Sequence, residues 1–238
     1  MAAAALILSL AAGGVALLGV GGSFLGFLSP LTGFQLFAAG ALIGGLLSVI
    51  VALIGIFLSR GGNDPDGRKK SVTGLAIGLG LIIIVLGAAS TAGDAPRIND
   101  ITTDLDNPPE FTSSMVVPDY VGRDMRYPEE FKAIVRESYP DLAPLRVSTS
   151  QQATFDQAIE IAESLGWEIS AQSEGRGVFD AQDVSSIFHF VDDITIRIDA
   201  EGSGSRIDMR SKSRDGQSDL GANAARIRAY FAMFGEAN

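Results

Sequence analysis

The sequence predicts an α+β protein in which a three-helix transmembrane anchor is followed by an antiparallel sheet with two main helices packed on one face. Three observations support this prediction. The first 59 residues carry no ionisable side chain, a further apolar run covers residues 71–91, and the chain beyond Gly93 is acidic and has the composition of an ordinary soluble domain. Globular domains of average composition hold roughly a quarter charged residues. A stretch that excludes charge so completely indicates a lipid environment.

Each apolar run is long enough to cross a bilayer, which takes about 20 mostly apolar residues. We expect spans over about residues 2–28, 34–58 and 71–91, with the Pro and Gly of residues 29–33 forming the first turn. The first run lacks the basic start and the cleavage site of a signal peptide. The expected organisation is therefore a transmembrane region over 1–93, an extended Pro-rich arm over 94–144 and an extramembrane domain over 145–238.

Each span contains two glycines four residues apart, which leave a flat stripe where helix backbones can approach closely. The stripes support two interpretations: the three helices pack on one another, or one stripe is left for a partner subunit. Because the three spans contain no charged residue, the sequence shows no sign of a proton relay or ion pathway. The glycine pairs are Gly22 and Gly26, Gly40 and Gly44, and Gly74 and Gly78.

The loop over residues 60–70 contains Arg60, Arg68, Lys69 and Lys70, whereas the loop over residues 29–33 has no basic residue. Short loops rich in Lys and Arg stay in the cytoplasm. We therefore expect a multi-pass protein of the inner (plasma) membrane with a cytoplasmic N-terminus and a periplasmic or extracytoplasmic C-terminal domain.

The chain beyond Gly93 holds all but two of the 28 acidic residues and all but four of the 18 basic ones, which leaves a net charge of −12. This charge repels phosphate and makes nucleic acid an improbable partner. The chain has no cysteine, which excludes thiol catalysis, haem attachment and thiolate metal sites. We expect no cofactor and no metal. The expected partners are the lipid bilayer and a membrane protein, with a small anion as a further possibility.

Within the arm, only residues 128–139 are expected to form a helix. The extramembrane domain then opens with an amphipathic helix over residues 149–166, for which Ser148 and Gln151 suggest a capping box and Gly166 a stop. Strands are expected over residues 167–171 and 177–184. A second amphipathic helix is expected to run to the C-terminus, with its apolar positions at Leu220, Ala224, Ile227, Phe231 and Phe234.

The clearest hairpin pairs residues 191–200 with residues 205–212 around a loop over 201–204. Two registers keep the apolar faces together. One places Arg197 opposite Asp208 and Asp199 opposite Arg206, whereas the other sets Arg197 against Arg210. Opposite charges directly across a ladder stabilise it, so we expect the first register. The other face of this hairpin would then be an exposed ladder of charges, whose pairs contribute about 0–1 kcal/mol each.

The densest polar cluster lies where the last strand leads into the last helix. In the structural interpretation, Ser218 or Asp219 caps the helix, and Asp192 or Asp193 neutralises the cations. In the functional interpretation, Arg214 and the free amides at the helix start hold a phosphate, a carboxylate or an acidic glycan. The candidate residues are Arg210, Ser211, Lys212, Ser213, Arg214, Gly216, Ser218, Asp219, Asn223 and Arg226.

This run, read R-S-x-S-R-x-G-x-S-D-x-G-x-N, resembles the bacterial and plastid family known as domain of unknown function 1499. The resemblance extends over about residues 100–234. It also rests on Leu165-Gly166-Trp167, on the segment from Phe190 to Arg197, on Ile101-Thr-Thr-Asp104 and on Asn107-Pro-Pro109. It implies no activity and no catalytic residues.

Other candidate sites are weaker. His189 is the only histidine, so a typical zinc site is excluded, and no motif links it to Ser185 or Ser186. Asp192 and Asp193 are strand neighbours that point to opposite faces. Asp104, Asp106 and Glu110 could hold calcium weakly, but we expect them to be solvated. The expected function is a structural or interaction subunit of a membrane or envelope complex. Anion binding around Arg214 is the alternative, and no catalytic activity is expected.

Overall fold

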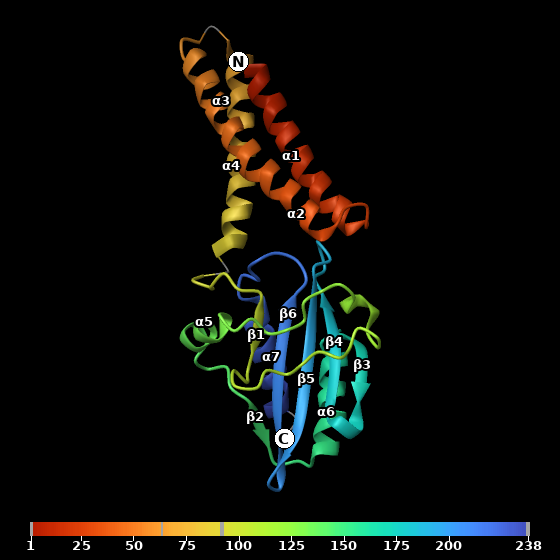
Figure 1. Ribbon diagram of the computed structural model, residues 1–238. Coiled ribbons are helices and arrows are strands. Elements are labelled where there is room, and N and C mark those ends of the chain that lie inside the picture. The colour runs from red at the N-terminus through yellow and green to blue at the C-terminus, as the bar shows by residue number, and fades with distance from the viewer. Residues whose placement is uncertain (1, 63, 91–92, 237–238) are drawn as a thin grey trace. The chain divides into compact units, whose positions relative to one another are not determined.

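The computed structural model describes residues 2–62, 64–90 and 93–236 and divides into two units (Figure 1). The helical unit comprises the chain up to Gly93 together with the short segment Ser186–His189. The α+β unit comprises Asp94–Ser185 and the chain from Phe190 onward.

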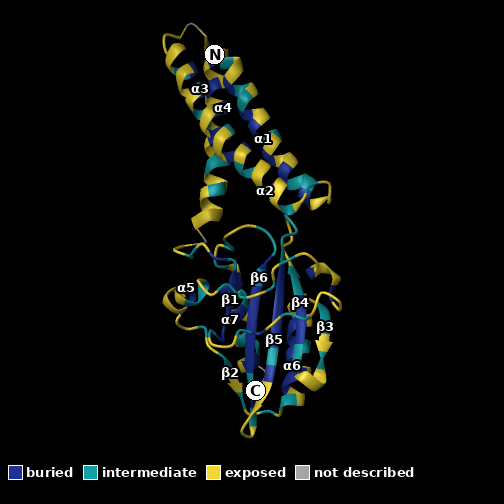
Figure 2. Cartoon of the chain, in the orientation of Figure 1, coloured by how far each residue is buried: buried dark blue, intermediate teal, exposed yellow. Residues whose placement is uncertain are grey.

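The helical unit contains three helices that are long and apolar enough to cross a membrane. The first is α1 (Ala2–Phe24), and the third is α4 (Pro65–Ser90). The second runs without a break through α2 (Pro30–Ala38), the π-helical segment η1 (Ala39–Gly44) and α3 (Gly45–Leu58). Figure 2 shows many exposed residues along all three helices. An apolar surface of this kind suits contact with lipid.

Two of these helices begin earlier than the apolar pattern predicts. Pro30 was expected to break the chain, but it starts α2, where the Ser29 hydroxyl accepts the amide of Thr32 at 3.3 Å. Pro65 starts α4, where Asp64 accepts the amide of Gly67 at 2.8 Å. Proline suits the first helical position, and Ser or Asp suits the cap before it. The predicted end of the third span at residue 91 lies outside the described residues.

Four of the six glycines singled out by spacing lie at contacts between helices. A Cβ atom would come within 2.7 Å of the Ala16 nitrogen at Gly40, and within 2.8 Å of the Gly45 carbonyl oxygen at Gly78. Gly44 and Gly74 are equally close to α1. The stripe predicted for the first helix was wrong, because α1 ends at Phe24 and Gly26 lies beyond it with a φ of +75°.

The α+β unit is built on a six-stranded antiparallel sheet in the order β1-β6-β5-β4-β3, with β2 also paired to β6. The strands are β1 (Asp100–Thr102), β2 (Leu145–Val147), β3 (Glu168–Ser173), β4 (Val178–Val184), β5 (Val191–Glu201) and β6 (Gly204–Ser213). The short helices are η2 (Pro118–Tyr120), α5 (Phe131–Ser138) and η3 (Glu174–Arg176).

Two longer helices, α6 (Gln151–Ser164) and α7 (Ala222–Glu236), lie behind the sheet in Figure 1. Between them and the sheet lies an apolar core that includes Ile194, Ile196 and Ile198 from β5. The predicted α+β class, with two main helices on one face of an antiparallel sheet, is confirmed. The cap of α6 is Ser150, whose hydroxyl accepts the Ala153 amide, rather than the predicted Ser148.

The predicted hairpin register is confirmed, because Arg197 lies opposite Asp208 and Asp199 opposite Arg206. The ladder continues to a Glu201–Gly204 pair, so the turn has two central residues where we expected a loop of four. Gly202 makes this tight turn possible, since its φ of +61° is easily adopted only by glycine.

The Pro-rich arm, residues 94–144, contributes a strand to the sheet. Its first residues form β1, which pairs with β6 from Asp100 opposite Lys212 to Thr102 opposite Arg210. The chain then crosses the face of the sheet opposite α6 and α7, where Val117 and Tyr120 are buried (Figure 1). The arm is therefore part of the folded domain.

Candidate functional site

The polar face of the sheet is buried beneath the arm. Alternate residues of β4, β5 and β6 place Asp180, Asp193, Asp208 and Arg210 on this face, and each side chain is at most 1% exposed. The expectation of an exposed charge ladder was wrong, because the sequence of a single strand pair does not reveal that the arm covers its polar face. Buried charges must be paired, and each of these groups has partners from several elements.

The first cluster joins the hairpin to the start of the arm. Arg197 and Arg206 each donate to the buried carboxylate of Asp208, at 2.9 and 3.1 Å. Both also donate to Asp104, at 3.0 and 2.7 Å. Burial raises the pKa of Asp208. Burial also acts on Asp104, but the amide of Asn107 and the charge of Arg206 hold its pKa below the usual value.

Asp104 is therefore a structural anchor rather than a solvated residue. Its Oδ1 atom accepts the amides of Asp106 and Asn107, which turns the chain at the end of β1. Among the described residues, no group of three His, Cys, Asp or Glu side chains is arranged to hold a metal.

The second cluster is centred on Arg214. Its Nε and Nη2 atoms donate to Asp193, at 3.0 and 2.7 Å, and its Nη1 atom donates to Asp119 of the arm at 3.0 Å. Arg123, also in the arm, donates to the same Asp193 carboxylate at 2.6 Å. Burial disfavours the charge of Arg214, yet Asp193 and Asp119 together raise its pKa. All three guanidinium nitrogens are thus engaged by carboxylates of the chain itself.

The third cluster contains Asp192, which lies beside Asp193 in β5 but on the opposite face of the sheet. Arg226 of α7 binds Asp192 at 2.5 Å and Asp183 at 2.8 Å. Its Nη1 atom donates to Asn223 at 2.6 Å, and Asn223 in turn accepts from Ser211 at 2.7 Å. Asp192 and Asp193 therefore serve different arginines and cannot act together on one substrate.

The turn between β6 and α7 uses its own polar groups to start the helix. Asp219 accepts the amides of Gly221 and Asn223, at 2.9 and 3.0 Å, and burial raises its pKa. Ser218 accepts the Leu220 amide at 3.3 Å. Gly216 and Gly221 have φ values of +81° and +86°, which glycine adopts without strain. Two amides that could have bound an external anion are occupied by Asp219.

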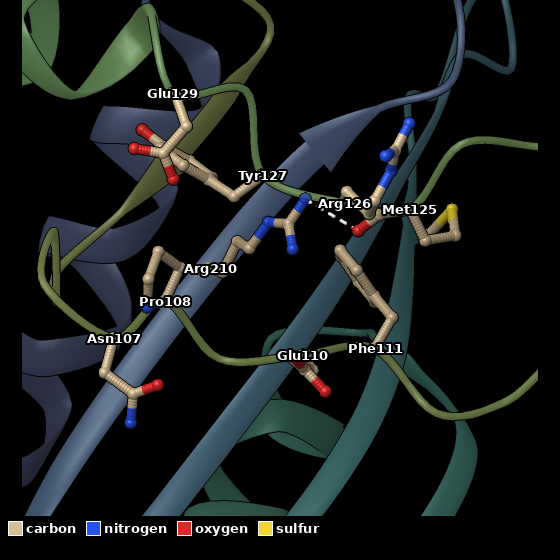
Figure 3. A pocket seen from close by; sticks show the side chains of 9 residues that line it. All are labelled: Asn107, Pro108, Glu110, Phe111, Met125, Arg126, Tyr127, Glu129 and Arg210. Atoms are coloured by element: carbon tan, nitrogen blue, oxygen red, sulfur yellow. Dashed lines mark hydrogen bonds between the residues drawn. The ribbon is translucent and has the colours of Figure 1, made fainter.

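Arg210 lies apart from Arg214, at the base of a cavity (Figure 3). Its Nε and Nη2 atoms bind the two carboxylate oxygens of Asp100 in β1, at 2.9 and 2.7 Å. Lys212 binds the same carboxylate at 3.0 Å. Two backbone carbonyls of the arm complete the shell, Pro109 at 3.3 Å and Met125 at 3.0 Å from the guanidinium. Arg210 thus ties β6, β1 and two parts of the arm together.

The cavity at Arg210 has a volume of about 410 Å³ and is walled almost entirely by the arm. The rings of Phe111 and Tyr127 lie 4.8 and 5.2 Å from the guanidinium carbon. The hydroxyl of Tyr127 is buried and has no hydrogen-bond partner among the described residues. The lining residues are Asn107, Pro108, Glu110, Phe111, Met125, Arg126, Tyr127, Glu129 and Arg210.

Several residues of this face were not found from the sequence, above all Asp100, Arg123, Tyr127 and Asp180. Asp180 is buried in β4, where it accepts the Thr112 amide at 2.8 Å and the Tyr120 hydroxyl at 3.3 Å. Burial raises its pKa. The sequence did contain a signal for Asp180, because strand alternation places it on the face of β4 opposite Phe179 and Ala181, which is the polar face of the sheet.

The weaker candidates have ordinary surroundings. His189 is partly buried and lies in the loop before β5, with a φ of +59°. The Ser185 hydroxyl closes the same loop by accepting the Phe190 amide at 2.8 Å. Trp167 stacks on Tyr230 in the core, with the ring centres 5.0 Å apart.

Comparison with known proteins identifies a family match over most of the α+β unit. A search of curated proteins finds no match. The family model described as "Protein of unknown function (DUF1499)" matches residues 100–234, from the start of β1 to the last turns of α7. This match spans more than half of the chain, and it includes the Arg210 cavity and the turn around Arg214. The chain therefore belongs to the DUF1499 family and carries three apolar helices before its DUF1499 domain.

Proposed function

We propose that this protein is a plasma-membrane protein whose DUF1499 domain lies outside the cytoplasm and serves as an interaction subunit of a membrane or envelope complex. In this proposal the domain acts by binding another protein and not by catalysis. The observation that carries it is a segment of the arm, residues 115–121, which exposes three apolar side chains and is anchored by two buried ones.

Three side chains of this segment are unusually exposed for apolar residues: Met115 at 91%, Val121 at 69% and Val116 at 61%. Their neighbours Val117 and Tyr120 are buried, at 3% and 2% exposed. Exposed apolar groups that gather in one place mark interaction sites, and methionine is enriched in protein interfaces. Because these buried side chains hold the segment in place, it loses little conformational entropy when a partner binds to it.

The base of the segment is well anchored. The amides of Val116 and Val117 both donate to the Ser113 carbonyl, at 2.8 and 3.1 Å. Below them, the Tyr120 hydroxyl binds Asp180 of the sheet, and the Tyr120 ring packs edge-on against Phe111. The arm thus presents Met115, Val116 and Val121 on a turn that is already folded.

The distribution of basic residues supports the proposed side of the membrane. Arg60 lies between α3 and α4, and Arg68, Lys69 and Lys70 lie in the first turns of α4, whereas the turn between α1 and α2 has no basic residue. The positive-inside rule then supports a cytoplasmic junction and an extracytoplasmic DUF1499 domain.

Anion binding at Arg214, the alternative from sequence, is less well supported. Asp193 and Asp119 already occupy the guanidinium, and Asp219 occupies two amides at the start of α7. An external anion would have to displace a buried carboxylate, which costs several kcal/mol when a charge is left unpaired.

In-cell photocrosslinking tests the proposal. A photoreactive residue at position 115 or 121 should give one discrete crosslinked species, whereas the same residue at exposed position 163 on α6 should give none. Met115→Asp and Val121→Asp should reduce recovery of that species without lowering the melting temperature. Equal crosslinking from all three positions, or none at all, would contradict an interface on this segment.

A further inference from the structure

The loop between β4 and β5, residues 185–190, exposes a second apolar segment. From Val184 to Val191 the chain has no Asp, Glu, Lys or Arg, and Ile187 within it is 52% exposed. Although this loop lies within the residues that the family model matches, its segment Ser186–His189 belongs to the helical unit. The surroundings of Ser186–His189 are therefore those of the apolar helices.

Aromatic contacts within the helical unit place the loop beside the start of the second span. The ring of Phe188 lies edge-on to Phe34, with the ring centres 5.5 Å apart, and 5.8 Å from the centre of the Phe37 ring. His189 stacks on Phe24 at the end of α1, with the ring centres 6.0 Å apart. Aromatic pairs favour separations of about 4.5–7 Å. Phe188 and His189 thus hold the loop on α1 and α2, while Ile187 remains exposed.

The position of these contacts along the second span gives the depth of the loop. The span from Pro30 to Leu58 has 29 residues, and at 1.5 Å per residue it is about 43 Å long. This length matches a bilayer with its headgroup regions, about 40–45 Å, whereas the hydrocarbon core alone measures about 30 Å. Phe34 and Phe37 lie about 6 and 10 Å from the start of the helix. With the span centred in the bilayer, the loop lies where the headgroups meet the hydrocarbon.

The polar groups of the loop suit this depth. The Ser185 amide donates to the Phe190 carbonyl and the Ser185 hydroxyl accepts the Phe190 amide, both at 2.8 Å. Backbone groups that are paired in this way do not need water, which lowers the cost of contact with lipid. The flanking carboxylates of Asp183 and Asp192 are bound by Arg226 at 2.8 and 2.5 Å. Neither carboxylate at the base of the loop is therefore an unpaired charge.

We propose that the β4–β5 loop is a membrane contact that inserts Ile187 into the boundary between the headgroups and the hydrocarbon, beside the start of α2. The partner is lipid, because the surface next to the loop continues that of the spans. Leu25 and Phe27, which follow the Phe24 ring that His189 contacts, are 64% and 81% exposed. Apolar side chains of membrane-surface segments insert at this boundary to a depth of about 5–10 Å. The inference rests on the membrane insertion of the three helices and not on the interface at residues 115–121.

Site-directed spin labelling of the full-length protein tests the contact, because the chain has no cysteine and one label can be placed at a time. Ile187→Cys is compared with Ile83→Cys, on the exposed surface of α4, and with Ser203→Cys, in the exposed turn between β5 and β6. The protein is studied in liposomes of phosphatidylethanolamine and phosphatidylglycerol. Power saturation measures the contact of each label with oxygen, which concentrates in lipid, and with a nickel chelate, which stays in water. The oxygen-to-nickel ratio at position 187 should lie well above that at 203 and at or below that at 83.

Two phenylalanine variants test what positions the loop. Phe34→Ala removes a ring that contacts Phe188 and should lower the oxygen-to-nickel ratio of the label at 187. Phe27→Ala is the matched control, because its ring is 81% exposed and is not among the described rings that contact the loop. This control should leave the ratio unchanged. An unchanged ratio in Phe34→Ala would contradict a loop held beside α2.

The three labels also separate this inference from the membrane insertion on which it rests. A ratio at 187 as low as that at 203, with lipid contact at 83, would overturn the loop contact and leave the spans in place. Low ratios at all three positions would contradict membrane insertion itself. A label at 187 that neither reagent reaches would show that protein covers Ile187, which would also reject a lipid contact.

Discussion

Arg214 binds the buried carboxylate of Asp193 through two of its nitrogens, with Nη2 2.7 Å from Oδ1. The pair joins the end of β6 to the start of β5, and Arg123 adds the arm from the other side at 2.6 Å. Asp193 is completely buried, whereas Arg214 is 21% exposed. The residue that looked most like a ligand-binding group in the sequence is thus fully used in holding the domain together.

Arg214→Ala should lower the free energy of unfolding of the full-length protein by about 2 kcal/mol, since hydrogen bonds to charged groups contribute about 1.5–3 kcal/mol. Arg123 still neutralises Asp193, so the loss should stay below that of an unpaired buried charge. Chemical denaturation in detergent measures the change. Asp219→Ala, which removes a helix-capping group, provides a comparison with an expected loss of about 1 kcal/mol.

The same measurement in phosphate separates a structural role from a binding role. The parent should show no phosphate-dependent rise in its unfolding midpoint, because the guanidinium is already occupied. A rise in the parent that disappears in Arg214→Ala would restore anion binding at this turn.

Gly78→Leu should separate α3 from α4, because a Cβ at position 78 would lie 2.8 Å from the Gly45 carbonyl oxygen and 3.1 Å from Ser48. Overpacking of this kind costs about 1–3 kcal/mol. The melting temperature in detergent measures it. Gly80→Leu is the matched control, since a Cβ there has no described atom within 4 Å. Equal melting temperatures for the two variants would show that Gly78 does not support helix packing.

The proposed topology predicts that alkaline phosphatase fused to the C-terminus is active and that a fluorescent protein fused there is dark. Fusions placed after Gly62, at the basic junction, should show the reverse. Enzyme activity and fluorescence in intact cells give the result. The opposite pattern would place the DUF1499 domain in the cytoplasm.

Asp180→Asn should stabilise the protein more at neutral pH than at acidic pH. Burial raises the pKa of Asp180 above its ordinary 3.8, so the folded state binds this proton more tightly than the unfolded state. Stability therefore falls as pH rises from the ordinary pKa to the raised one. Asparagine does not titrate, so the variant does not lose stability in this way. Its unfolding free energy should rise relative to the parent by about 1.4 kcal/mol for each unit by which folding raises the pKa of Asp180.

Unfolding between about pH 4 and about pH 7 tests this linkage in both proteins. The difference in unfolding free energy, variant minus parent, should increase with pH. A difference that stays constant across this interval would show that Asp180 titrates alike in the folded and unfolded states.

The sequence alone determined the features that depend on neighbouring residues. The absence of charge over residues 1–59 defined two spans. In β5 and β6 the apolar alternation allowed two registers, and the opposite charges selected the one that places Arg197 opposite Asp208. The starts of two helices were predicted less well. The structure begins them at Pro30 and Pro65, whereas the apolar pattern predicted starts at residues 34 and 71.

Only the tertiary structure decided that the polar face is buried and that a cavity lies above Arg210. Asp100 and Arg210 are 110 residues apart, and Asp104 and Arg206 are 102 apart, so no local pattern links them. All four are Asp or Arg, residue types that usually lie on the solvated surface. They are buried because the arm covers the charged face of the sheet and forms hydrogen bonds with it. The arm is too poor in apolar periodicity to form a core of its own. A buried charge is tolerated only where hydrogen-bond partners exist, and their positions are settled by the fold as a whole.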